Sequence, residues 1–463
     1  MPFCWMNRKN FPIGLLATIS LLAPDLGAVG LFQPAHNARY GGMGGVNLAI
    51  GGSPMDIATN PANLNVSNRK EIEFGVSLPY IRTVYKDRFL DPDPNISYQN
   101  SESYNVLAPL PYFAVRIPIT DNLTYGGGIY IPGGGTGNVS GLTRITPDGQ
   151  TFNSWSGLNA PSPIGDSKKI QESYSTQFFL VKTTHALSYK IGDFTFALGI
   201  EGVYSRQIAY QKFYDITGNI EVPGQGFYYR SKNAFALGGI LGANYNITDK
   251  FRIAYSYETG TKIPLDGDMQ VGSRPGRTGV SASFSVPERH GIGISYGTEK
   301  FRIGLDWLYY NYSSYTTTYK QTLASSVFPT PFGETNTIPQ NINYHDAWAL
   351  GLGGEYNYNA WTYRAGIRHN SGVLRSDGTN ALQAGIMVQD LVSGGIGYQS
   401  GKWKFDFTLL YYLPAKVTGN PSTDWNVNHS IFSISDIRLS EFKHSLKSDI
   451  PAILIGASYS FDS

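Results

Sequence analysis

The sequence predicts an all-β protein: a transmembrane antiparallel β-barrel of about 14 strands with an N-terminal plug inside its lumen. Three observations lead to this fold class. Side chains alternate with a period of two from Lys70 to the C-terminus, short polar turns alternate with long polar connections, and a glycine-rich apolar segment, residues 33–68, precedes the first strand. An even number of strands places both chain ends on the side of the short turns.

The composition fits a membrane barrel. The chain of 463 residues contains 53 Gly, 32 Tyr and 24 Phe, and only 15% of its residues are charged, whereas about 25% is usual for a soluble globular domain. The net charge of +2 gives no reason to expect a nucleic-acid partner. Because the only cysteine, Cys4, lies near the N-terminus, a mature chain without that end has neither a disulfide nor a thiolate metal site.

The N-terminus has the pattern of an export signal. Arg8 and Lys9 precede an apolar run, residues 11–24, and Ala28 or Gly30 offers a small residue for cleavage. The run is too short for a membrane helix, which needs about 20 residues. We therefore expect a signal peptide in residues 1–28, a plug in residues 29–68 and the barrel in residues 69–463.

The segment before the first strand predicts short helical turns packed as a plug. Its glycine pairs allow backbone angles closed to other residues, and Pro54 and Pro61 interrupt it. A flexible linker is the alternative. The apolar residues are more numerous than a solvated linker would carry; they are Val46, Leu48, Ile50, Met55, Ile57 and Leu64.

The predicted strands have one bulky apolar face and one face that collects the charges. In residues 301–310, Phe301, Ile303, Leu305, Trp307 and Tyr309 alternate with Arg302, Gly304, Asp306, Leu308 and Tyr310. Residues 72–80, 251–258, 361–368 and 403–411 repeat the pattern. A Lys or Arg facing lipid near the bilayer midplane costs about 2–4 kcal/mol, so the uncharged face is expected to face lipid.

A soluble β-sandwich would show the same alternation, and the loop lengths favour the barrel. Tight turns are expected at residues 120–122, 191–193, 247–249, 297–299, 357–359 and 399–401. Long connections are expected at residues 86–103, 137–172, 213–228, 263–286, 319–342, 371–389 and 415–447. Strict alternation of short and long connections is typical of outer-membrane barrels.

The tripeptide Asn60-Pro61-Ala62 follows the glycine pairs of this segment and lies just before the first strand. With about 14 strands behind it, this arrangement resembles the outer-membrane long-chain fatty acid and aromatic hydrocarbon transporter family (FadL/TodX-like, OMPP1), over essentially the whole mature chain. The terminal strand, residues 450–461, resembles the signal that the barrel assembly machinery recognises, although two residues follow its last aromatic.

The resemblance implies passive uptake of hydrophobic compounds across the outer membrane of a diderm bacterium, by a monomer surrounded by lipid and lipopolysaccharide. It implies no enzymatic activity and no cofactor, and it makes Asn60, Pro61 and Ala62 part of the plug. The family's third strand is kinked inward, which leaves an opening in the barrel wall. Here that strand carries Gly128, Pro132, Gly133, Gly134 and Gly135, which disfavour regular pairing. The alternative is that these glycines only begin a long loop.

Inward parity gives the candidate ligand contacts in the lumen: Arg116, Arg252, Arg302, Leu308, Tyr310, Arg364, Arg368 and Lys404. A carboxylate headgroup would need one of the cations. Alternatively, the cations pair with Glu73, Glu201, Asp306, Glu355 or Asp406 to brace barrel and plug. Aromatic residues of the outer loops, such as Phe152 and Trp155, are expected to capture the ligand first.

Two other functions remain open, a porin for polar solutes and a surface adhesin or receptor anchored by the barrel. Residues 91–95 (DPDPN) have the oxygen spacing of a calcium loop or of a solvated turn. His345-Asp346 is the only close pair of His and acid, and no glycine run has a Walker pattern, so neither hydrolase nor phosphate-binding chemistry is expected.

Overall fold

The structure is a computed structural model. It describes residues 32–461 except 147–148, 223–225, 272–275, 316–317, 325–327, 331–332, 336, 342–343, 375–389 and 420–442. The predicted signal peptide, residues 1–28, lies outside the described residues.

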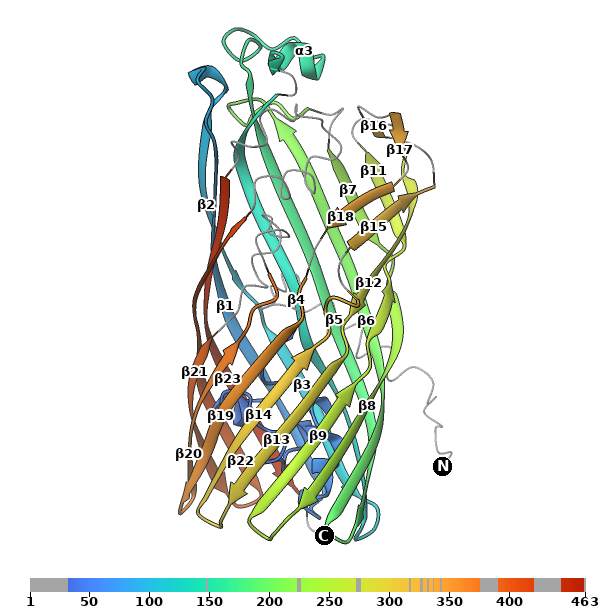
Figure 1. The fold of residues 1–463 in the computed structure, drawn as a ribbon, viewed down its shortest axis with the longest axis vertical. Helices are drawn as coiled ribbons and strands as arrows, with labels where there is room; N and C mark the ends of the chain where they lie inside the picture. The colour runs from blue at the N-terminus through green and yellow to red at the C-terminus, as the bar shows by residue number, and fades with distance from the viewer. Residues whose placement is uncertain are drawn as a thin grey trace, which may run out of the picture.

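The chain forms one closed antiparallel barrel with its long axis vertical in Figure 1. The first strand, β1 (Glu71–Phe89), pairs with the last, β23 (Lys443–Ser460), from Glu71↔Ser460 to Arg88↔Lys443, and this pairing closes the sheet. Several membrane-spanning strands are divided into two or three elements, and counting these together gives 14 spans. The predicted fold class is therefore confirmed.

The remaining elements are as follows. The strands are β2 (Tyr98–Leu107), β3 (Leu110–Pro118), β4 (Leu123–Ile145), β5 (Lys169–Ile191), β6 (Phe194–Tyr214), β7 (Phe227–Ser231), β8 (Ala234–Asn246), β9 (Phe251–Glu258), β10 (Thr261–Pro264), β11 (Gly267–Val271), β12 (Thr278–Val286), β13 (Arg289–Gly297), β14 (Phe301–Tyr310), β15 (Thr318–Leu323), β16 (Phe328–Thr330), β17 (Gly333–Thr335), β18 (Thr337–Asn341), β19 (Ala347–Tyr358), β20 (Trp361–Asn370), β21 (Leu391–Ser400) and β22 (Trp403–Gly419). The helical elements are α2 (Ala38–Gly41), η1 (Pro54–Ala58), η2 (Pro61–Val66), η3 (Pro94–Ile96) and α3 (Phe152–Ser156).

The two faces of each strand meet different surroundings, as the alternation predicts. On β14, Phe301 and Trp307 are 40% and 39% exposed and face outward, whereas Asp306 and Tyr310 are only 4% and 8% exposed and face inward. The same outward row of exposed apolar side chains continues around the barrel. Since an aqueous surface would not favour such a row, the outer face is suited to lipid.

The predicted tight turns all lie at one end of the barrel, called here the short-turn end; the other is the long-loop end. The predicted long connections are wrong in extent. Residues 137–172 include the end of β4 and the start of β5, and residues 263–286 and 319–342 contain further strands. Beyond the membrane both faces of a strand can meet water, so the contrast between alternate residues that identifies a strand in the sequence is lost.

The predicted plug lies inside the barrel near the short-turn end, where α2, η1 and η2 follow one another (Figure 1). Each begins with a side-chain cap. Asn37 accepts a hydrogen bond from Tyr40 N at 2.9 Å, Ser53 and Asp56 form a capping box, and Asn60 caps η2 in front of Pro61. The prediction of short helical turns is confirmed. In the described part of the chain, no helix has the length and apolarity needed to cross a bilayer.

Candidate functional site

Polar contacts from several strands anchor the plug to the inner wall. Asp306 Oδ2 on β14 accepts from the backbone N–H groups of Asn47 and Leu48 at 2.7 and 2.9 Å. The Arg39 side chain forms a buried ion pair with Glu355 on β19 at 2.7 Å. Hydrogen bonds to the charged Asp306 are stronger than neutral ones. The plug is therefore fixed at defined positions on the wall.

Asn60 is the residue by which the predicted tripeptide contacts the barrel. Its Nδ2 donates to Leu48 O within the plug and to Asn244 Oδ1 on β8, both at 2.8 Å, while Oδ1 accepts from Ala62 N at 3.2 Å. The facing wall residue is Gly242, where a Cβ atom would overlap Asn60 Oδ1 and come within 2.8 Å of Ala62 N. A glycine at this position is required for the close approach of plug and wall.

The wall has a break between β2 and β4. β2 pairs with β1 from Phe89↔Tyr98 to Tyr80↔Leu107, whereas β3 pairs with both β1 and β4. Pairing of β3 with β4 ends at Tyr112↔Tyr130, and all of β2 and β4 is described without a backbone ladder between them. We call the space between these two strands, above Tyr130, the wall opening.

The predicted glycines and proline lie beside this wall opening. The register between β4 and β5 shifts between Tyr130 and Gly133, so that Ile131 and Pro132 form a bulge. β4 continues to Ile145, which excludes the alternative that the glycines merely begin a loop. Gly128 lies below the bulge against Ile57 of the plug, and Gly133, Gly134 and Gly135 pair with β5 above it.

The start of the plug covers the bulge from inside. Gln33 Nε2 donates to Ile131 O at 2.6 Å, and Gln33 N donates to Pro132 O at 2.7 Å. Two carbonyls at the wall opening are thus satisfied by a plug residue. His36 packs its ring on Tyr130 at a centroid distance of 4.8 Å. Burial, with a further contribution from Arg289, lowers the pKa of His36 to about 3, so this ring is neutral.

A polar cluster limits the wall opening towards the long-loop end. Asn100 on β2 donates from Nδ2 to Thr143 O on β4 at 3.0 Å and accepts from Thr143 N at 2.8 Å. Beside it, buried Arg144 forms ion pairs at 2.6 Å with both Asp87 and Glu172. Here the Asn100 side chain takes the place of the missing backbone ladder.

Above the plug, the lumen is lined with apolar and aromatic side chains. Leu308 and Tyr310, two of the predicted ligand contacts, are buried there together with Tyr312 and Tyr344. Phe32, at the start of the plug, stacks on Tyr310 at a centroid distance of 5.5 Å. A second apolar cluster lies beside the first and shares its partly buried rings Phe32, Phe178 and Phe284. Such a surface suits an apolar molecule.

Arg368 supplies a positive charge at the edge of this apolar region. It is 7% exposed, and it donates to Asn370 Oδ1 at 3.0 Å and to Tyr310 Oη at 3.4 Å. Among the described residues, no carboxylate lies within ion-pair distance of this guanidinium. Since a buried charge is usually paired, Arg368 is the best placed of the predicted cations to receive an anionic headgroup.

The sequence profile of a family described as outer membrane protein transport protein (OMPP1/FadL/TodX) matches residues 175–462, more than half of the chain. The chain belongs to this family. It is therefore an outer-membrane barrel of a family of transport proteins for hydrophobic compounds, not enzymes. Since short turns of such barrels lie in the periplasm, the short-turn end is the periplasmic end and the long-loop end is extracellular.

Solved structures have the same fold at low identity. A Pseudomonas aeruginosa FadL homologue matches with a TM-score of 0.66 and 16% identity, covering 94% of this chain and 100% of that one. The Pseudomonas putida toluene transporter TodX gives 0.64 and 15%, covering 95% and 100%. The Ralstonia pickettii toluene transporter TbuX gives 0.56 and 17%, covering 93% and 99%. No curated protein matches the chain in sequence.

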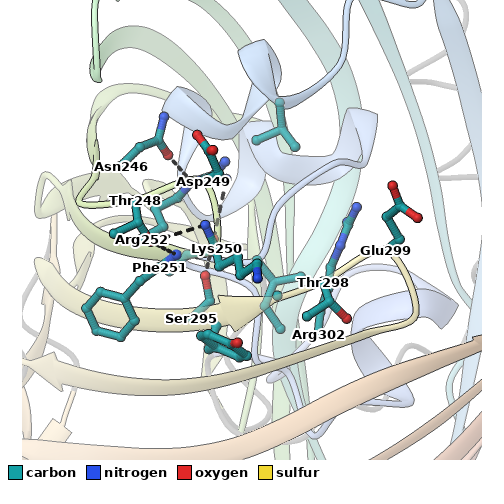
Figure 2. A pocket seen from close by; sticks show the side chains of 15 residues that line it. Asn246, Thr248, Asp249, Lys250, Phe251, Arg252, Ser295, Thr298, Glu299 and Arg302 are labelled. Carbon is teal, nitrogen blue, oxygen red and sulfur yellow. Dashed lines mark hydrogen bonds between the residues drawn. The ribbon is translucent and has the colours of Figure 1, made fainter.

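For this OMPP1/FadL/TodX family member, two predicted lumen cations prove to be far from the apolar region. Arg252 and Arg302 line a cavity of about 400 Å³ between the plug and two periplasmic turns (Figure 2). Arg252 donates to Asn246 Oδ1 at 2.8 Å, and Arg302 lies 3.7 Å from Glu355. Each is the second residue of a strand that starts at the periplasmic end. A ligand arriving from outside would meet them only beyond the plug.

The other predicted cations also lie near the periplasmic end. Arg116 forms an ion pair with Glu71, and Arg364 pairs with Glu355 at 3.2 Å and with Asp406 at 2.8 Å. Lys404 is the second residue of β22, next to this group of charges. The alternative of bracing ion pairs therefore describes Arg116 and Arg364, whereas Arg368 is seven residues into β20 and reaches the upper lumen.

The sequence did not reveal Gln33 or Asn100, because a single amide side chain in a polar context carries no pattern. Phe152, expected to capture ligand, is the first residue of α3 and is fully buried against Ile170 and Phe213. In residues 91–95 the Asp93 side chain accepts from Asn95 N at 2.9 Å, a local turn. Among the described residues, no group of three or more His, Cys, Asp or Glu is placed to hold a metal.

Proposed function

We propose that this protein takes up hydrophobic compounds passively, in three steps. A ligand enters from the extracellular end and binds in the apolar upper lumen above the plug. The start of the plug then moves away from the bulge in β4. The ligand leaves sideways through the wall opening into the membrane. The observation that carries this proposal is the pair of hydrogen bonds from Gln33 to the carbonyls of Ile131 and Pro132.

Binding in the upper lumen rests on burial of apolar surface. Each methylene transferred from water contributes about 0.8 kcal/mol, so a long acyl chain or an aromatic ring needs little polar recognition. Phe32 lies both beside Gln33 and on Tyr310, which couples the ligand region to the wall opening. A ligand that displaces Phe32 also pulls on Gln33.

Sideways exit is supported by the uneven distribution of contacts between the plug and the wall. Anchors at Asp306, Glu355 and Asn244 hold its body, whereas its first described residues are joined to the wall by the two Gln33 bonds at the bulge. Moving the start of the plug therefore breaks far fewer contacts than expelling the plug. A path straight down to the periplasm would require the loss of all of them.

A reversible tether tests this step. Since the only native cysteine, Cys4, lies in the predicted signal peptide, the pair Gln33→Cys and Pro132→Cys would be the only thiols of the mature barrel. Their main chains are joined by a hydrogen bond, which brings the two positions within disulfide range. Oxidation should abolish uptake of a labelled hydrophobic compound, and reduction should restore it. Full uptake by the oxidised protein would refute exit at the bulge. The two single cysteine variants are the controls.

The substrate class is open between long-chain fatty acids and aromatic hydrocarbons. Arg368 favours a ligand with an anionic headgroup, because a hydrocarbon would leave its buried guanidinium with neutral hydrogen-bond partners alone. Mass spectrometry of compounds that remain bound through purification identifies the class directly. Deletion of residues 31–60 tests the porin alternative: a plugged transporter should gain ion conductance in planar bilayers, and unchanged conductance would favour a porin.

A further inference from the structure

Three polar side chains stand on the lipid-facing side of the barrel, just below the wall opening. They are Tyr125 on β4 and Thr183 and His185 on β5, and we call them the outer polar ladder. His185 is exposed, and its neighbours on the same face are apolar: Leu187 is 49% exposed, and Ile200, its partner on β6, is 64% exposed.

The ladder lies deep in the membrane. His185 is six residues above the periplasmic end of β5 at Ile191. With a rise of about 3.3 Å per residue and a strand tilt of about 40°, this places it about 15 Å from that end, well inside an apolar band about 25 Å tall. Headgroups of the surrounding lipids do not reach this depth.

The ladder is one directed chain of hydrogen bonds. The Thr183 hydroxyl donates to Gly128 O at 3.0 Å, so its oxygen is free to accept from His185 Nε2 at 3.3 Å. This leaves His185 Nδ1 as the acceptor for the Tyr125 hydroxyl at 2.7 Å. The longest bond, from Nε2 to Thr183, is the one that a better acceptor would replace most easily.

Strand pairing does not require these side chains. The backbone ladder between β4 and β5 is continuous from Leu123↔Tyr189 to Tyr130↔Lys182. Apolar residues at the same outward positions would avoid the cost of facing polar groups to hydrocarbon. Because these polar side chains face lipid just below the wall opening, they indicate a role for a molecule that passes there; Gly128, at the top of the chain of bonds, lies next to the bulge.

We propose that the outer polar ladder binds the carboxyl group of a long-chain fatty acid as it leaves through the wall opening. A carboxylate oxygen accepts from His185 Nε2–H in place of the Thr183 hydroxyl oxygen, while the Thr183 hydroxyl keeps its bond to Gly128 O. This inference rests on the proposed sideways exit and names its substrate as a carboxylic acid rather than a hydrocarbon.

The test compares His185→Leu with His290→Leu. His290 is a matched control: it is also on the outer face, seven residues above the periplasmic end of β13 at Gly297, and it bonds to a tyrosine, Tyr255 Oη at 2.9 Å, but β13 pairs with β9 and β14 and not with β4 or β5. Initial uptake of radiolabelled oleate and of toluene is measured in cells that have no other transporter for either. Folding is checked by the heat-dependent shift in gel mobility.

We expect His185→Leu to slow oleate uptake about tenfold, the effect of one hydrogen bond to a charged group, and to leave toluene uptake unchanged. His290→Leu should leave both unchanged. Equal losses for both substrates in His185→Leu, or no loss of oleate uptake, would overturn the inference. Wild-type protein that carries toluene but not oleate would overturn it as well and leave sideways uptake standing. Wild-type protein that carries neither would refute the proposed function itself.

Discussion

Replacing Asn60 by alanine should loosen the plug without disturbing the barrel. The substitution removes the cap on η2 and the hydrogen bonds from Nδ2 to Leu48 O and Asn244 Oδ1. A lost cap costs about 1 kcal/mol, and each lost buried hydrogen bond costs about as much. Leu48 O keeps a second donor, Asn63 Nδ2 at 3.0 Å, so it is not left bare. The total is about 3 kcal/mol, which raises the fraction of undocked plug about 100-fold.

Single-channel recording in planar bilayers measures this fraction as the time spent in a conducting state. Asn95→Ala, which removes an exposed amide from an outer turn, is the matched control and should behave as wild type. Gly242→Ala pushes on the same amide from the wall and should give a similar increase. In the double variant the two effects should be less than additive, because the overlap with Asn60 Oδ1 is removed whereas the close contact with Ala62 N remains. Wild-type conductance in Asn60→Ala would refute this account of plug docking.

Three further predictions follow from the plug, the lumen and the wall. Burial raises the pKa of Asp56, in the plug, from 3.8 to about 6, although the hydrogen bonds from Tyr40, Ser53 and Gly52 act to lower it. Because the pKa is higher in the docked plug, the contribution of this carboxyl to stability is greatest at low pH. It falls as pH rises from about 4 to about 6. The difference in unfolding free energy between wild type and Asp56→Asn should follow that pH profile, and a flat difference would contradict it. Arg368→Leu should weaken binding of oleate about tenfold and leave toluene binding unchanged, as measured by calorimetry, whereas Arg368→Lys should keep most of the affinity; equal losses for both ligands would count against a headgroup role. Asn100→Ala should extend the wall opening upward and speed hydrogen exchange of the Thr143 amide about tenfold; unchanged exchange would mean that other contacts hold β2 to β4.

The sequence predicts the barrel well because lipid and lumen impose opposite demands on alternate residues. Tyr310 and Asp306 were assigned to the inner face by parity alone, and both are buried there. Parity gives the face of a residue but not its height in the barrel. Distance from the start of a strand that follows a tight turn gives the height: Arg252 and Lys404 are the second residues of such strands, whereas Arg368 lies seven residues beyond Trp361, the first residue of β20. The turns themselves were predictable, so this separation could have been made from the sequence.

Other parts of the site depend on geometry that has no sequence pattern. The wall opening arises because β3 pairs with β4 whereas β2, which precedes β3 in the chain, does not, and because β4 bulges at Ile131 and Pro132. Glycines and proline marked the bulge, yet nothing in the sequence paired it with Gln33, about 100 residues away. Contacts of this kind follow from the register of the whole barrel.

The seam between β1 and β23 has a consequence for assembly. It joins residues at opposite ends of the chain, so it is the pairing with the highest entropic cost and should form last. The plug is continuous with β1, and its partners lie on strands as distant as β19 and β22. A sheet that is not yet closed can therefore form around the plug as a template before β1 pairs with β23. Once it has, the plug is enclosed by a wall that was shaped against it.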